Sequence, residues 1–167
     1  IEEQKAIDIE PTFVVNYIAY GMILKNARRY PEATAHFKKM LEKYGNNYFP
    51  YNWLWIIANA EGNGPEAYEW FIKDLTQSKT DPETIRLYQT AYRKSGWNGI
   101  LREKIRQDER ILITDKNPDF FYEIACFSAQ LGEKDEAFEN LNKAYERRRS
   151  SLNWIKIDSS LDSLHDD

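Results

Sequence analysis

A five-residue pattern recurs along the chain at a nearly constant distance. The segment Arg29-Tyr30-Pro31-Glu32-Ala33 reappears 34 residues later as Asn63-Gly64-Pro65-Glu66-Ala67. A third copy, Glu133-Lys134-Asp135-Glu136-Ala137, follows the second by 70 residues, which is two periods plus two residues. The residues four positions after each alanine are large and apolar: Phe37, Phe71 and Leu141. Self-similarity at a period of this size is the sequence signature of a repeat architecture.

Apolar residues inside and between these copies recur at helical spacing, as in Val14, Ile18 and Gly21 on one face. Four prolines begin segments of this kind, where a proline loses no helical hydrogen bond: Pro31, Pro65, Pro82 and Pro118. The pattern therefore predicts helices joined by short turns. Their expected ranges are 1–9, 12–27, 31–44, 48–61, 65–78, 82–95, 98–114, 118–131, 134–148 and 151–156.

Each period is long enough for a pair of antiparallel helices. A single pair cannot bury its apolar face, so neighbouring pairs have to stack, which twists the array into a superhelix. The alanine at the start of the second helix lets the two helices of a pair approach closely, and the large residue one turn later fills the space between them. We expect an all-α, right-handed solenoid of helix pairs. In the unit from Pro82, Leu101 takes the place of the alanine.

These features resemble the tetratricopeptide repeat family. The likeness is carried by Tyr17, Gly21, Leu24, Ala33 and Phe37, by Leu54, Ala58, Gly62, Ala67 and Phe71, and most fully by Phe121, Ile124, Ala125, Gly132, Ala137, Leu141 and Ala144. It predicts one repeat domain over 1–167. This domain consists of the end of a truncated repeat (1–13), repeats at 14–47, 48–81, 82–117 and 118–150, and a C-terminal capping segment (151–167). Trp55 departs from the pattern, because the family prefers Gly or Ala there.

A narrower likeness covers the C-terminal half. Ala91–Arg102, Leu131–Phe138, Ala144–Arg148 and Trp154–Asp158 are similar to the C-terminal repeat region of bacterial signalling proteins, mainly winged-helix transcriptional regulators. The resemblance implies a regulatory, partner-sensing module that follows another domain. The chain begins at Ile1 without an initiator Met, and we expect it to be part of a longer protein.

Composition narrows the function classes. The formal net charge is -4, whereas a nucleic-acid module normally carries a basic excess, so we expect no direct nucleic-acid binding. The longest strictly apolar run, Leu54–Ala58, is too short to span a bilayer. Cys126 is the only cysteine, which favours a reducing compartment. A cytoplasmic location is expected, or a periplasmic one if a membrane anchor precedes the segment.

The residues that could support catalysis are few. His36 is interpreted as a solvated helix position, His165 as part of a frayed acidic tail, and Cys126 as a small buried residue. The chain lacks a Gly-rich phosphate loop and the usual nucleophile and metal-site motifs. We therefore expect no enzyme activity, no cofactor and no metal. The run Arg147-Arg148-Arg149 is interpreted as a favourable cluster at a helix C-terminus.

Partner binding is the function that the resemblance implies. The first helix of each pair lines the groove of a tetratricopeptide array, and the expected groove residues are Ile18, Met22, Lys25, Phe49, Asn52, Ile56, Asn59, Arg86, Thr90, Arg93 and Tyr122. Such a groove is basic near Arg86, Arg93 and Lys94, which suits an acidic or C-terminal peptide of another protein, or an upstream domain of the same chain.

Two alternatives remain open at this point. The aromatic cluster Tyr48, Phe49, Tyr51, Trp53 and Trp55 has more rings than one helical face can bury. We expect most of them in the core, and those left over could form a pocket that senses a small ligand. The other alternative is self-association, in which the helix expected at 1–9 packs on a neighbouring copy.

Overall fold

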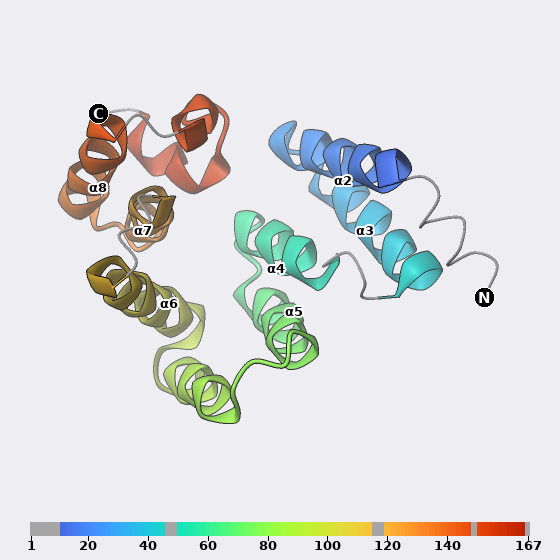
Figure 1. The fold of residues 1–167 in the computed structure, drawn as a ribbon, viewed down its shortest axis with the longest axis horizontal. Helices are drawn as coiled ribbons and strands as arrows, with labels where there is room; N and C mark the ends of the chain where they lie inside the picture. Colours follow the sequence, from blue (N-terminus) through green and yellow to red (C-terminus); the bar gives the residue numbers. More distant parts are fainter. Residues whose placement is uncertain (1–10, 46–49, 115–118, 148–149, 166–167) are drawn as a thin grey trace. The chain divides into compact units, whose positions relative to one another are not determined.

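The computed structural model describes residues 11–45, 50–114, 119–147 and 150–165, and every regular element in these ranges is helical (Figure 1). The elements are α2 (Pro11–Asn26), α3 (Tyr30–Tyr44), α4 (Pro50–Ala60), α5 (Gly64–Gln77), α6 (Pro82–Thr114), α7 (Asp119–Gln130), α8 (Lys134–Glu146) and the 3₁₀ helices η1 (Ser150–Trp154) and η2 (Ser159–Leu164). The all-α prediction is confirmed. The helix expected at 1–9 lies outside the described residues.

The chain divides into two compact units, Ile1–Ile85 and Arg86–Asp167. In the first unit α2 packs on α3, α3 on α4, and α4 on α5. In the second unit α7 packs on α8, and the C-terminal 3₁₀ helices pack on α7. A solenoid that runs through both units stays a prediction.

The turns inside three helix pairs share one backbone geometry. The residue in the left-handed region is Arg28 (φ 61°), Gly62 (φ 73°) or Gly132 (φ 77°). In all three turns the next residue donates its N–H to the carbonyl five residues earlier, at 2.9 Å. This hydrogen bond defines a Schellman helix end. Because these turns are 34 and 70 residues apart, the period found in the sequence corresponds to a recurring hairpin.

The small residue after each turn is completely buried. Ala33, Ala67 and Ala137 are all 0 % exposed. The large residues one helical turn later are also buried: Phe37, Phe71 and Leu141. Gly21 on α2 serves the same close approach, since a Cβ there would lie 2.4 Å from Cζ of Phe37.

Trp55, which departs from the family pattern, occupies the position in the second pair that is equivalent to Gly21. Its ring is buried and meets the edge of Phe71 at a centroid distance of 5.6 Å. Its indole N–H donates to Oδ2 of Asp74 at 3.3 Å. Trp53 stacks on Phe37 of the preceding pair. The described rings of the aromatic cluster therefore pack within the first unit, and Tyr48 and Phe49 lie outside the described residues.

His36 is not the solvated residue that the sequence suggested. Its ring stacks on Tyr17 with the centroids 3.8 Å apart, and Nε2 lies 2.8 Å from the Tyr17 carbonyl oxygen. His36 lies on the side of α3 that faces α2, and the polar edge of its imidazole ring meets the backbone of α2.

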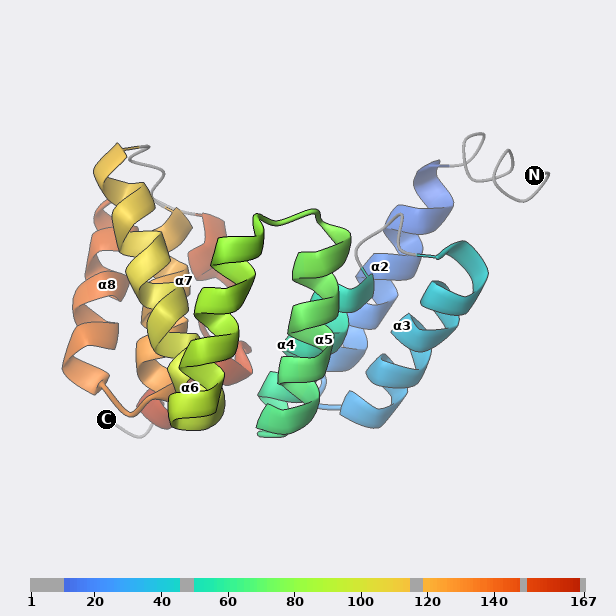
Figure 2. The ribbon, with the colours of Figure 1, turned by 90° about the horizontal axis from the view of Figure 1, so that it is seen from below.

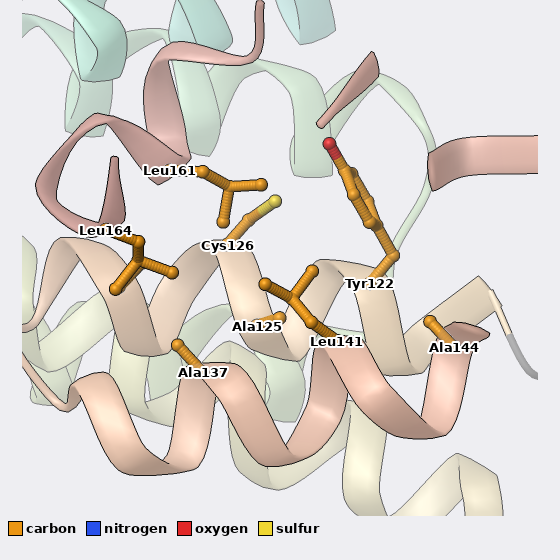
Figure 3. Close-up of a cluster of buried hydrophobic side chains, with 9 residues drawn as sticks. Tyr122, Ala125, Cys126, Ala137, Leu141, Ala144, Leu161 and Leu164 are labelled. Carbon is orange, nitrogen blue, oxygen red and sulfur yellow. The ribbon is translucent and has the colours of Figure 1, made fainter. Parts of the chain in front are cut away.

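The segment 158–165 is also different from the frayed tail expected from its composition. Leu161 and Leu164 are 1 % and 6 % exposed and pack beside Cys126 on α7 (Figure 3). Asp158 caps η2 by accepting the N–H of Ser160. The two leucines are three residues apart and lie on one face of the segment. Their burial against α7 holds the segment in place although it is rich in acidic residues.

Candidate binding cleft at the elbow of α6

Helix α6 bends sharply at Ser95 and Gly96 and thereby forms two arms, 82–94 and 97–114 (Figure 2). Gly96 adopts φ 58°, a left-handed conformation that glycine tolerates without strain. Gly99 lies against the first arm, since a Cβ there would be 2.2 Å from the Ala91 carbonyl oxygen. The two expected helices at 82–95 and 98–114 are thus present, joined by a two-residue elbow.

An open cleft of about 310 Å³ lies between the arms, within the second unit. Its lining comes from Leu87, Thr90, Ala91, Lys94 and Ser95 of the first arm and from Gly99, Arg102, Glu103 and Arg106 of the second. The cleft therefore combines apolar atoms, two hydroxyl groups and three cationic side chains.

The cations of the cleft differ in how far they are already paired. Arg102 donates to Glu133 at 3.0 Å, and Arg106 pairs with Glu103. Lys94 forms no ion pair within the part of the chain that the structure describes. A guanidinium carries five N–H donors, so each arginine keeps donors for another acceptor. The wall therefore offers three cations against one carboxylate, Glu103.

Glu103 is nine-tenths buried yet well partnered. Its two carboxylate oxygens accept from Arg106 and from Nε2 of Gln107, the latter at 2.8 Å. A buried carboxylate with two donors orients those donors. Glu103 thereby positions Arg106 at the cleft.

A second buried carboxyl, that of Asp108, belongs to the same arm. Asp108 is 5 % exposed, and its Oδ2 has no hydrogen-bond partner among the described residues. Burial raises its pKa to about 7, with Lys104 opposing the shift and Glu123 adding to it. Burial also raises the pKa of Tyr88 on the first arm, and the nearby Asp108 and Glu103 add to that shift. Both shifts favour the protonated, uncharged forms of Asp108 and Tyr88 in the folded protein.

The residues expected to line one groove are distributed over both units. Those of the first unit are half-buried: Ile18, Met22, Lys25, Asn52, Ile56 and Asn59. Phe49 lies outside the described residues. Arg86, Thr90 and Arg93 are exposed on the first arm of α6, and Arg93 donates to Oγ1 of Thr90 at 3.1 Å. Of this set, only Thr90 lines the cleft.

Tyr122 is covered by the chain's own C-terminal segment. It is 8 % exposed, and its hydroxyl donates to Oδ2 of Asp158 at 3.1 Å. Burial raises the pKa of this phenol. Cys126, one turn further along α7, is buried as expected. This face of α7 is therefore filled by the C-terminal segment rather than open to a partner.

Sequence reasoning missed Arg102 and Arg106 as cleft residues. Their spacing of four residues places them on one side of the second arm, which is the signal that could have identified them. The orientation of that side toward Lys94 depends on the elbow, and the periodicity of the sequence does not encode it. Arg147, from the basic run at the end of α8, lies over the Phe121 ring at 5.0 Å.

The described residues contain no group of three or more His, Cys, Asp or Glu side chains arranged to hold a metal ion. None of the described helices has the length and apolar character needed to cross a membrane. Comparison with family profiles, curated proteins and solved structures finds no match to this chain.

Proposed function

We propose that this chain is a non-catalytic protein-interaction module of the tetratricopeptide type, and that its α6 elbow binds an acidic peptide segment of a partner. The observation that carries the proposal is the cleft itself, which is lined by the cations Lys94, Arg102 and Arg106 and by the apolar side chains of Leu87 and Ala91. An acidic segment with interspersed apolar residues matches both features.

The recurring hairpins support the repeat-module part of the proposal. Three turns with one Schellman geometry and a completely buried alanine after each are the local structure that a helix-pair repeat requires. The likeness of Ala91–Arg102 and Leu131–Phe138 to bacterial signalling regulators supports a regulatory role for the binding. We also propose that the module acts in the cytoplasm.

Charge supports the acidic class of ligand. Lys94 is exposed, and Arg102 and Arg106 reach the cleft from the facing arm. Guanidinium groups bind carboxylates through paired N–H donors, and such charge-assisted hydrogen bonds are stronger than neutral ones. The overall negative charge of the chain, -4, disfavours nonspecific capture of acidic peptides outside this region.

The proposal is tested with a fluorescein-labelled peptide in which glutamates alternate with leucines, titrated by fluorescence anisotropy. Lys94→Glu is expected to weaken binding roughly fivefold to twentyfold, which corresponds to the loss of about one charge-assisted contact. The matched control is Lys39→Glu, an exposed lysine on α3 of the other unit. Equal affinities of wild type and Lys94→Glu, or an equal loss in both variants, would remove the cleft from the proposal.

The double variant Arg86→Glu with Arg93→Glu tests whether the binding surface extends along the first arm. We expect weaker peptide binding with an unchanged far-UV circular dichroism spectrum, because both side chains are exposed and Arg93 contacts Thr90 at the cleft. A lysine-for-glutamate version of the peptide should not bind. Binding of both peptides alike would show that the interaction is not electrostatic.

A further inference from the structure

The lining of the α6 cleft carries more positive charge than one carboxylate of a ligand can match. Lys94, Arg102 and Arg106 carry three positive charges, and Glu103 is the one carboxylate among the lining residues, which leaves a net charge of +2. A carboxylate side chain of a peptide supplies one negative charge. A phosphorylated hydroxyl side chain supplies about 1.5 to 2 negative charges at neutral pH, together with three strong acceptor oxygens.

Both arginines can turn toward an anion without leaving a buried carboxylate unpaired. The side chains of Arg102 and its partner Glu133 are 48 % and 36 % exposed, and such an exposed ion pair contributes little to stability. The buried carboxylate of Glu103 also accepts from Nε2 of Gln107 at 2.8 Å. It therefore keeps a donor when Arg106, whose side chain is 56 % exposed, directs its other N–H groups into the cleft.

The donors of the cleft approach from two directions. Arg102 and Arg106 are four residues apart and lie on one side of the second arm, about 6 Å from each other along the helix axis. Lys94 belongs to the facing arm, because the chain turns back at Gly96. Guanidinium groups bind phosphate oxygens through paired N–H donors. Two forks on one side and an ammonium on the other suit the three oxygens of a single phosphate.

The first arm also offers the ligand an apolar contact. Leu87 lines the cleft and is 38 % exposed. It lies seven residues before Lys94, which is about 10 Å along a helix at 1.5 Å per residue. Three residues of an extended peptide cover about the same length, at roughly 3.3 Å each. Free phosphate leaves Leu87 uncovered, whereas a peptide with an apolar residue three positions from the phosphate contacts both ends of the arm.

We propose that the α6 cleft selects a phosphorylated peptide segment, in which a phosphoserine or phosphothreonine meets the cations and an apolar residue three positions away meets Leu87. The inference rests on the proposed function, because it names the acidic group that the same cleft binds. Phosphorylation of the partner then switches the interaction on. The net charge of the chain, -4, argues against the phosphate backbone of a nucleic acid as the ligand.

Three fluorescein-labelled peptides test the selectivity by fluorescence anisotropy with the full 167-residue chain. Each has a leucine three residues to either side of a central serine, glutamate or phosphoserine. The phosphoserine peptide should bind at least about tenfold more tightly than the serine peptide and about fivefold more tightly than the glutamate peptide, since it gains charge-assisted hydrogen bonds.

The outcomes separate this inference from the proposed function. A glutamate peptide that binds as tightly as the phosphoserine peptide overturns the phosphate selectivity and leaves the acidic-peptide proposal intact. If none of the three peptides binds, both proposals fail. Replacing the two leucines of the phosphoserine peptide with glycine should weaken binding about threefold to tenfold, because apolar contact with Leu87 is lost. Unchanged affinity would overturn the leucine spacing.

Arg102→Gln locates the phosphate. This variant should lower the affinity for the phosphoserine peptide about tenfold and reduce its advantage over the glutamate peptide. The matched control is Arg110→Gln, an exposed arginine of the same arm that does not line the cleft. Equal effects of the two variants would overturn the assignment to the cleft.

Competing phosphates identify the source of the group. Inorganic phosphate should displace the phosphoserine peptide only far above the concentration at which the peptide itself binds, because it makes no contact with Leu87. Displacement at equal concentrations would show a site for the free ion and overturn the peptide proposal. Vesicles with phosphatidylinositol phosphate that bind as tightly as the peptide, and lose binding in Arg102→Gln, would assign the cleft to a lipid headgroup and overturn it as well.

Discussion

Replacing Asp108 with Asn should make the protein more stable at neutral and alkaline pH. The carboxyl is 5 % exposed, and Oδ2 lacks a hydrogen-bond partner among the described residues. Burial raises its pKa from 3.8 to about 7, and Glu123 reinforces the shift while Lys104 opposes it. An amide has nearly the same shape as the protonated acid and carries no charge at any pH in this range.

The direction of this stability change follows from the linkage between protonation and folding. The folded protein holds this proton more tightly than the unfolded chain, so the stabilisation is complete below about pH 4 and is lost as the pH rises to 7. A difference of roughly three pKa units corresponds to about 4 kcal/mol at most, at 1.36 kcal/mol for each unit. Because Lys104 can move toward the charged carboxylate, we expect a gain of about 2–4 kcal/mol for Asp108→Asn above pH 7.

Urea unfolding followed by circular dichroism, between pH 5 and pH 8.5, measures this difference. Near pH 5, about one pKa unit above the ordinary value of 3.8, the variant should already be more stable than wild type by roughly 1.5 kcal/mol, and the difference should widen as the pH rises to 7. A smaller slope remains in the variant, because burial also raises the pKa of Glu123. Glu109→Gln, at an exposed neighbouring carboxyl, is the control.

The reasoning is refuted if Asp108→Asn gains no stability relative to wild type between these two pH values. A direct ¹³C NMR titration that places the Asp108 pKa below about 5, within the ordinary spread for aspartate, would refute it as well.

Two further substitutions test the elbow and the C-terminal segment. Gly99→Ala should destabilise the protein by about 1–3 kcal/mol, because the new Cβ would meet the Ala91 carbonyl oxygen at 2.2 Å; thermal unfolding measures this, and the exposed Asn98→Ala should change little. Leu161→Ala should cost about 2–5 kcal/mol and speed amide exchange in α7, because the side chain is 1 % exposed in a core. Ile157→Ala, at 42 % exposure, should cost far less, and equal costs would mean that the segment is not docked.

Much of the local structure could be read from the sequence. The alanines at 33, 67 and 137 predicted close helix contacts, and all three are completely buried. The helix ranges agree within about two residues at most ends. The left-handed turn residue was visible as glycine in two copies, whereas Arg28 adopts the same conformation without that signal. Local hydrogen bonds of the helix end impose the conformation, so it persists although the side chain disfavours it.

The features of the candidate site depend on contacts between residues far apart in the chain. Arg102 and Arg106 face Lys94 only because the chain turns back at Gly96. Tyr122 is buried only because Asp158 and Leu161 return to α7 from more than thirty residues away. Periodicity reports which side of a helix is apolar, since that property repeats every 3.6 residues. Which segment covers that side is set by packing between distant segments, and only the tertiary structure decided it.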